Sequence, residues 1–303
     1  MNIQGLRLWP STIRRNAPAV LLQAVLSLMF ANSCRIAAWA QSTSEPQRKV
    51  PQLADQNDDD TIKADRPGVS DGSTVIGARR LQIESGVQLE YRRSGQTRQH
   101  LLFVPALLRI GISKHWEARI EGNTFNSEND FDVTGRTHHV GFAPLSVGVK
   151  YQIQESKGAR HPSLGAIVRL APAYGTSDFR THHATGDLRL AADWDFAPKF
   201  SLNPSFGVGV NEDRQGHTFV STETAATLSY SASKRLTPFI DFGLLAPEER
   251  NGKSAFIVDT GVAYIIRRNI QLDASAGKGV HGNTLPHPFL SFGISYRSDV
   301  LRR

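Results

Sequence analysis

The chain has 303 residues, of which 40% are hydrophobic and 21% are charged, and its formal net charge is +7. A basic balance of this kind suggests a nucleic-acid partner. However, Arg7, Arg14, Arg15 and Arg35 lie within the first 40 residues, which hold no acid, so the remainder carries a net charge of only +3. The charge therefore gives no support to a nucleic-acid partner, and the single cysteine, Cys34, excludes a disulfide within the chain.

Residues 1–40 have the features of a secretory signal peptide. Arg14 and Arg15 precede an apolar run over residues 17–30, which is too short to cross a bilayer. Residues 38–40 read Ala-Trp-Ala, the small-residue pattern of a cleavage site. Cleavage there predicts an exported chain without cysteine. A lipoprotein cut before Cys34 is the alternative, although the residues ahead of it match a lipobox poorly.

Residues 41–77 form a polar segment rich in Gln, Asp and Ser, with Pro46, Pro51 and the acidic run at residues 58–60. A segment with so few apolar residues cannot form a core of its own. We expect an irregular N-terminal segment that lies either in the periplasm or inside the lumen as a plug.

Residues 78–297 alternate apolar and polar side chains. In residues 81–91 the odd positions are apolar apart from Ser85, and eleven residues is the length that a tilted strand needs to cross a bilayer. The pattern recurs at residues 102–112, 116–120, 145–153, 164–170, 188–196, 202–210, 220–230, 238–244, 256–266, 270–276 and 290–296. This gives about twelve strands, an even number as in bacterial single-chain barrels. Residues 298–303 form a C-terminal tail.

The connections between these strands alternate in length. The even-numbered ones lie near residues 113–115, 155–162, 197–199, 233–235 and 267–269, and all but the second are tight. The longer, odd-numbered ones lie near residues 93–99, 123–142, 174–183, 211–217, 246–253 and 279–287. Short periplasmic turns and long outer loops are typical of outer-membrane barrels. The sequence therefore predicts an all-β, transmembrane, antiparallel up-and-down β-barrel in the outer membrane of a Gram-negative bacterium.

If the apolar face contacts lipid, the opposite face must line the lumen. The acids on that face are Glu84, Glu90, Glu117, Glu121, Asp187, Asp193, Asp195, Glu223, Asp241, Asp259 and Asp273. The bases are Arg92, Arg109, Arg119, Lys150, Arg169 and Arg189. The apolar face carries no charge, as a bilayer would require, because an Arg or Lys facing lipid costs about 2–4 kcal/mol at the midplane. These residues are the candidate permeation path, and their excess of acids predicts cation selectivity.

Four short motifs resemble a known family. They are Asp65-Arg66-Pro67, the strand Gly77 to Gly86 with its Gln82-Ile83-Glu84-Ser85-Gly86 ending, Val147-Gly148-Val149-Lys150-Tyr151, and Phe292-Gly293-Ile294-Ser295-Tyr296-Arg297. The sequence is similar here to transporter-like outer-membrane proteins named for the meta-cleavage (MetA) pathway of phenol degradation. The resemblance implies a barrel that passes small, often apolar or aromatic, compounds. One departure is the tail after Tyr296, because such barrels usually end on the aromatic residue that the barrel assembly machinery recognises.

No cofactor is predicted, and no catalytic constellation is apparent. A lipid-hydrolysing barrel enzyme would need a His-x-Ser-Asn-Gly type element, and residues 281–283 lack the serine. His138, His139, His182 and His183 lie in two outer loops and could ligate a divalent metal, although solvated loop histidines are far commoner. We expect a channel or transporter whose partners are outer-membrane lipids, a small-molecule permeant and the assembly machinery. A closed structural or adhesive barrel and a barrel enzyme are the alternatives.

Overall fold

The computed structural model describes residues 60–94, 96–247, 249–281 and 286–298. Within these ranges it contains the antiparallel strands β1 (Leu81–Ser94), β2 (Thr97–Gly111), β3 (Trp116–Asp132), β4 (Gly135–Gly141), β5 (Ser146–Gln154), β6 (Ser163–Ala171), β7 (Thr185–Ala197), β8 (Phe200–Glu212), β9 (Thr218–Tyr230), β10 (Leu236–Leu245), β11 (Ala255–Arg267), β12 (Ile270–His281) and β13 (Pro286–Ser298). None of the described residues forms a helix long and apolar enough to span a membrane. The predicted signal peptide and residues 41–59 lie outside the described residues.

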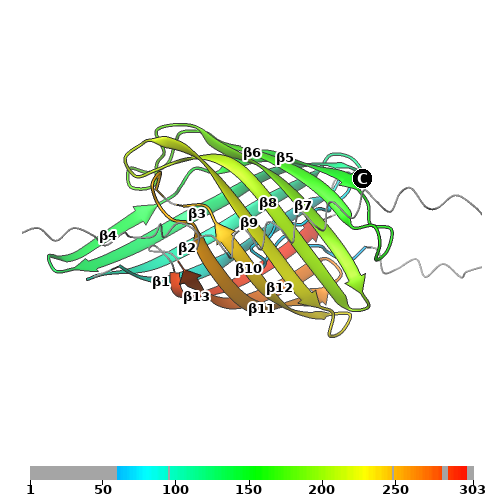
Figure 1. Ribbon diagram of the computed structural model, residues 1–303. Coiled ribbons are helices and arrows are strands. Elements are labelled where there is room, and N and C mark those ends of the chain that lie inside the picture. Colours follow the sequence, from blue (N-terminus) through cyan, green and yellow to red (C-terminus); the bar gives the residue numbers. More distant parts are fainter. Residues whose placement is uncertain (1–59, 95, 248, 282–285, 299–303) are drawn as a thin grey trace, which may run out of the picture. The chain divides into compact units, whose positions relative to one another are not determined.

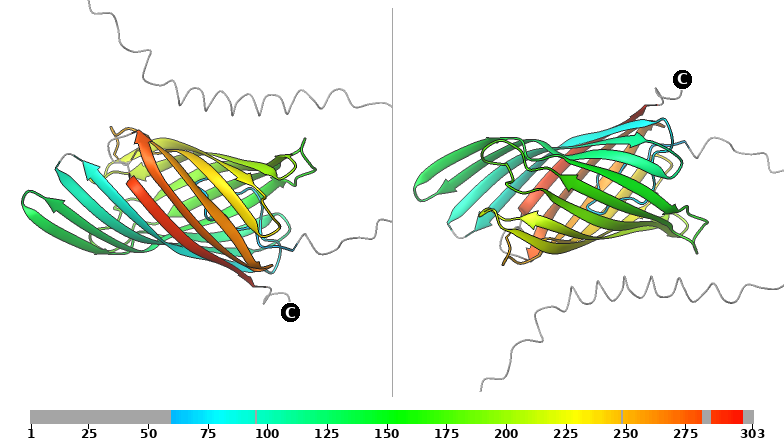
Figure 2. Two further views of the ribbon diagram at one scale, coloured as in Figure 1. Left: turned by 90° about the horizontal axis from the view of Figure 1, so that it is seen from below. Right: turned by 90° about the horizontal axis from the view of Figure 1, so that it is seen from above.

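The strands close into a barrel (Figures 1 and 2). Each strand from β5 to β12 pairs with the next strand along the chain. β13 then pairs with β1, and β1 pairs with β2. The ring is completed by β3, which pairs with β2 on one side and with β5 on the other. β4 pairs only with the far half of β3, as an extension of the wall. Twelve strands therefore form the ring, and the predicted up-and-down barrel is confirmed.

The expected loop lengths are wrong for the first two outer connections. Strands β1 and β2 are separated by residues 95–96, where a loop over residues 93–99 was expected, and much of residues 123–142 belongs to the β3–β4 hairpin. The reason is physical. Beyond the bilayer both faces of a strand meet water, so the backbone ladder continues without the apolar alternation that marks a strand in the sequence. The longest outer connections are those over residues 172–184 and 246–254.

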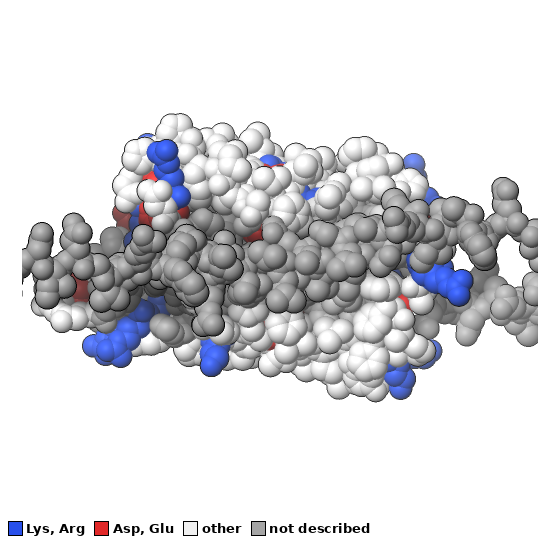
Figure 3. Space-filling model, viewed as in Figure 1, with Lys and Arg blue, Asp and Glu red and all other residues white. Residues whose placement is uncertain are grey.

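The outer surface of the wall is apolar. Ile83, Val147 and Ile294 are each about half exposed, at 47%, 50% and 51%, although all three belong to strands of the ring. On the face visible in Figure 3 the wall is almost entirely uncharged, and most Lys and Arg side chains lie toward its two ends. A surface of this kind is unfavourable in water and favourable in hydrocarbon, which fits a transmembrane barrel.

The interior of the barrel is polar and charged. Its largest fully buried side chains include Glu84, Arg109, Glu117, Lys150 and Asp241. Residues 60–77, called here the lumen segment, fill part of this interior. The segment begins at the end of the barrel with the short turns, the turn end, where the Ile62 amide donates to the Arg268 carbonyl at 2.7 Å. It returns to the same end, where Gly77 packs against Gly111. The opposite end of the barrel is called the loop end.

Candidate permeation pathway

The first anchor of the lumen segment is Glu84, which lies near the start of β1 and is fully buried. Its two carboxylate oxygens accept hydrogen bonds from the backbone amides of Asp65 and Arg66, at 3.2 and 2.9 Å. Gln82, two positions earlier on the same face, donates to Glu84 at 2.8 Å and to the Lys63 carbonyl at 3.0 Å. A buried carboxylate is stable only when it is hydrogen-bonded or paired, so Glu84 fixes the path of the segment.

The Asp65 side chain forms ion pairs with three bases of the wall. Its carboxylate lies 2.6 Å from Arg119, 2.8 Å from Lys150 and 3.4 Å from Arg109. Burial favours the protonated acid, but the charges of these three bases outweigh it and hold the pKa of the Asp65 carboxyl well below its usual value. Asp65 is therefore ionised, and it neutralises part of a basic region formed by β2, β3 and β5.

The Arg66 side chain contacts the wall on the other side of β1. Its guanidinium donates to Asp273 on β12 at 3.2 Å and to the Ser291 hydroxyl on β13 at 2.9 Å. It lies against Gly86 and Gly293, where an added Cβ would come within 3 Å of its nitrogens. Asp65 and Arg66 thus attach neighbouring backbone positions to the parts of the wall that lie on either side of β1.

Further hydrogen bonds and ion pairs hold the rest of the lumen segment. The Val69 amide donates to Asp241 at 3.2 Å, the Ser73 hydroxyl to Asp193 at 2.8 Å, and the Ile76 amide to Glu117 at 3.0 Å. Asp71 accepts from Arg189 at 3.0 Å. The segment therefore crosses the lumen and is bonded to strands β3, β7 and β10 as well as to β1, β12 and β13.

Charges on β1 to β9 form an alternating network along the wall. Consecutive ion pairs join Glu84, Arg109, Glu117, Arg119, Glu121, Arg169, Asp187, Arg189 and Glu223. The seven pairs from Glu84 to Arg189 have distances of 2.5 to 3.4 Å. The sequence placed all of these residues on the inner face, and the structure brings them together into one cluster. Because each charge has an opposite neighbour, this side of the lumen contributes little net field.

The wall on β10 to β12 is different. Asp241 and Asp259 lie directly opposite each other in the β10–β11 ladder, and Asp273 lies on β12 beside β11. Among the described residues, Asp273 pairs with Arg66, whereas Asp241 and Asp259 have no ion pair with a base. One carboxylate oxygen of each of the three acids is buried without a hydrogen-bond partner. The acidic excess predicted for the lumen is therefore concentrated on this side.

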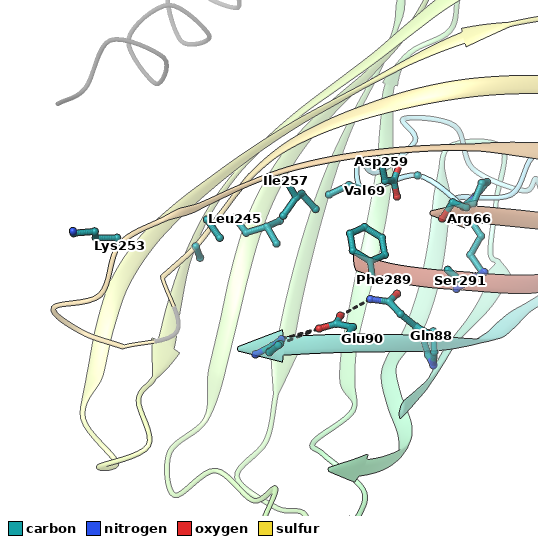
Figure 4. A pocket seen from close by; sticks show the side chains of 17 residues that line it. Arg66, Val69, Gln88, Glu90, Leu245, Lys253, Ile257, Asp259, Phe289 and Ser291 are labelled. Atoms are coloured by element: carbon teal, nitrogen blue, oxygen red, sulfur yellow. Dashed lines mark hydrogen bonds and ion pairs between the residues drawn. The ribbon is translucent and has the colours of Figure 1, made fainter. Parts of the chain in front are cut away.

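Two cavities occupy the lumen on either side of the segment. The loop-end pocket has a volume of about 310 Å³ and is lined by Arg66, Pro67, Gly68, Val69, Gln88, Glu90, Arg92, Pro105, Leu245, Ala246, Lys253, Ala255, Ile257, Asp259, Ser275, Phe289 and Ser291 (Figure 4). The turn-end cavity has a volume of about 950 Å³ and is more polar, with Gln152, Asp193, Asp195, Asn203 and Gln271 in its wall. Arg66 and Gly68 line both cavities.

The remaining predicted lumen residues lie apart from the central network. Glu90 and Arg92 form an ion pair at 3.0 Å in the loop-end pocket, and Asp195 lines the turn-end cavity. Sequence reasoning missed the buried apolar side chains of the inner face, which are Leu101, Leu107, Ile167, Phe239, Ile257 and Phe289. It also missed Gln82, Asp71 and Arg297. The residues of this group that belong to strands occupy the same alternate positions as the predicted lumen charges. The two-residue period therefore already placed them on the inner face, and this signal was available in the sequence.

The four histidines predicted to lie in outer loops are not assembled around a common point, and His138 and His139 lie on β4 instead of in a loop. His182 and His183 both contact Glu212, whereas His139 contacts Asp178 and His138 contacts Ser127. Across the described residues no group of three or more His, Cys, Asp or Glu side chains is placed to hold a metal ion. These contacts tie the loop over residues 172–184 to β4 and β8 instead.

Solved structures with a similar fold include an outer membrane channel from Pseudomonas putida F1, with a TM-score of 0.53, 12% identity, and coverage of 77% of this chain and 99% of that one. The translocator domain of the autotransporter NalP from Neisseria meningitidis gives a TM-score of 0.46 at 8% identity, covering 95% and 100%. The β domain of the Bordetella autotransporter BrkA gives 0.45 at 15% identity, covering 72% and 97%. The first likeness supports the barrel fold. No curated protein matches the chain.

A family model matches residues 64–297, which is more than half of the chain. The match begins at the segment that holds Asp65 and Arg66 and ends at the last strand of the ring, so it covers the plugged barrel described above. The chain therefore belongs to the family described as "Putative MetA-pathway of phenol degradation".

Proposed function

We propose that the protein is an outer-membrane channel for small molecules with a large apolar part. One observation carries this proposal: a single lumen holds a cavity at each end, and Arg66 and Gly68 of the lumen segment line both. Displacement of this part of the segment would join the two cavities into a path through the barrel. A barrel with a structural role alone would gain nothing from such an arrangement.

The lining of the loop-end pocket supports an apolar permeant. Val69, Leu245, Ile257 and Phe289 are among its apolar lining residues, and eight of its seventeen lining residues are polar or charged (Figure 4). Pockets for small organic molecules combine apolar walls with polar groups that fix the orientation of the ligand. The family description refers to phenol degradation, and a phenol combines an aromatic ring with one polar group.

We also propose how the protein reaches its site of action. Residues 1–40 would be cleaved during export, the assembly machinery would insert the barrel, and the uncharged wall would contact outer-membrane lipids. The turn end would then face the periplasm, because the N-terminal segment begins there, and the loop end would face the outside. Purified protein should be β-rich by circular dichroism and heat-modifiable on gels. Recovery from the soluble periplasmic fraction without detergent would contradict this location.

Planar-bilayer conductance and liposome-swelling measurements test the channel. Wild-type protein should conduct weakly, and Arg66→Ala or removal of residues 41–70 should increase conductance, because both loosen the lumen segment. Arg235→Ala is the matched control, because Arg235 is exposed in the turn between β9 and β10 and lines neither cavity. Absence of conductance and of uptake even without residues 41–70 would favour a closed structural barrel. Lipid hydrolysis by the purified protein would favour an enzyme.

A further inference from the structure

The loop-end pocket combines apolar side chains with a buried acid that has no basic partner in the described part of the chain. Asp259 lines the pocket and is only 4% exposed. Its Oδ1 atom has no hydrogen-bond partner among the described residues, and no described Lys or Arg forms an ion pair with it. A buried carboxylate in this condition is unfavourable unless a donor or a cation reaches it.

Negative charges on neighbouring acids make it more favourable for Asp259 to accept from a hydrogen-bond donor or to bind a cation. Asp241 faces it across the β10–β11 ladder, and Asp273 lies on the neighbouring strand. Of the bases that line the pocket, Arg66 pairs with Asp273 and Arg92 with Glu90, and Lys253 belongs to the connection beyond the end of β10. Of the two acids that line the pocket, Glu90 is therefore paired with a base, whereas Asp259 has no base paired with it among the described residues.

The remaining surface of the pocket suits a ring or a short hydrocarbon chain. In Figure 4 the Phe289 ring lies below Asp259, with Val69 and Ile257 on the adjacent side. Gly277, opposite Phe289 in the β12–β13 ladder, makes room for both, because an added Cβ would come within 2.5 Å of the ring and of the Asp259 side chain. An apolar cavity of about 150 Å³ holds a benzene molecule, so 310 Å³ can hold a ring with a short side chain.

We propose that the loop-end pocket binds a small apolar molecule that carries one hydrogen-bond-donating head group, and that it prefers a protonated amine to a neutral alcohol and excludes carboxylates. Asp259 accepts from the head group, while Phe289, Ile257 and Val69 contact the apolar part. The Phe289 ring can also attract a cation through its negative face. This inference rests on the proposed channel function and specifies which molecules would enter it.

Binding to the full-length protein in detergent, measured by calorimetry, tests the proposal with three probes of similar size: 2-phenylethylamine, 2-phenylethanol and phenylacetate. The amine should bind at least about tenfold more tightly than phenylacetate, with the alcohol between them, because charge-assisted hydrogen bonds are the stronger ones. Asp259→Asn should weaken the amine about tenfold or more and change the alcohol by less than about threefold. Asp195→Asn, in the turn-end cavity, is the matched control and should change neither.

A second variant protects the test against a folding defect. Ile257→Lys places a base on the same face as Asp259, two residues away on β11, and should weaken the amine while strengthening phenylacetate. Equal affinity for all three probes, or unchanged amine binding in Asp259→Asn, would overturn the proposal. Uptake of the probes by liposomes without this order of affinity would refute the pocket's preference and leave the channel intact. No uptake and no conductance would instead refute the channel itself.

Discussion

Gly86 and Gly293 lie directly opposite each other in the β1–β13 ladder, and together they leave the space that the Arg66 guanidinium fills. A Cβ on Gly293 would come within 2.7 Å of Arg66 and Asp273 side-chain atoms, whereas one on Gly86 would also meet the backbone oxygen of Phe292 at 2.3 Å. Glycine is required here for close approach between a side chain and a sheet, not for an unusual backbone conformation.

The first prediction concerns this close approach. Gly293→Ala should displace Arg66 while leaving the strands paired, because the groups it meets are flexible side chains. The expected result is higher conductance in planar bilayers with unchanged heat modifiability. Ile294→Val, at the next, outward-facing position, is the control. Wild-type conductance in Gly293→Ala would mean that the Arg66 contact does not hold the lumen segment.

The second prediction concerns Glu84, which accepts hydrogen bonds from the Asp65 and Arg66 amides. Glu84→Gln should destabilise the seated segment by about 2–3 kcal/mol, because bonds to a charged acceptor are lost in a buried site. We expect increased conductance and faster proteolysis near residue 66. Glu128→Gln should have neither effect, since Glu128 lies near the end of β3 and lines neither cavity. Protection equal to wild type would contradict the role given to Glu84.

The third prediction concerns ion selectivity. The bases Arg109, Arg119, Lys150, Arg169 and Arg189 are matched by wall acids and by Asp65 and Asp71, whereas Asp241 and Asp259 have no basic partner in the described part of the chain. Reversal potentials under a salt gradient should therefore show cation preference. The preference should decrease in an Asp241→Asn, Asp259→Asn double variant. It should also decrease toward 1 M salt, where the Debye length is about 3 Å. Anion preference in the wild type would show that the unpaired acids do not line the constriction.

The fourth prediction concerns pH. Because the pKa of Asp65 is lowered in the folded protein, its contribution to stability is complete above the unfolded pKa of about 3.9 and is lost as the pH falls through the folded pKa. Asp65 should therefore hold the segment equally well at pH 8 and pH 5. Asp65→Asn should raise conductance by the same factor at both values. A wild-type conductance that rises between pH 8 and pH 5, and does not in Asp65→Asn, would contradict this.

The fifth prediction concerns orientation in the membrane. Single cysteines at Asp132, the end of β3, and at Gly252, in the β10–β11 connection, should react with a membrane-impermeant maleimide on intact cells. A cysteine at Lys199, in the β7–β8 turn, should react only after the outer membrane is permeabilised. Labelling in the reverse order would place the turn end outside and require the opposite insertion.

The sequence by itself determined the wall of this protein. A bilayer requires apolar side chains on the lipid-facing side of every strand. Apolar and polar residues therefore alternate in the part of each strand that lies within hydrocarbon. The same period assigned Glu84, Arg109, Lys150 and Asp273 to the inner face. It did not reveal the β3–β4 hairpin, because strand residues outside the bilayer meet water on both faces.

Only the tertiary structure decided what the inner charges contact. Asp65 and Lys150 are 85 positions apart, and Arg66 and Asp273 are 207 positions apart, so no local pattern relates them. Four motifs that are separate in the sequence meet inside the barrel around Asp65 and Arg66. They are the Asp65–Arg66 pair itself, Glu84 with Gly86, Lys150, and Gly293. The lumen segment has no apolar period because its partners are wall charges, and closure of the barrel alone brings those charges within hydrogen-bonding distance of it.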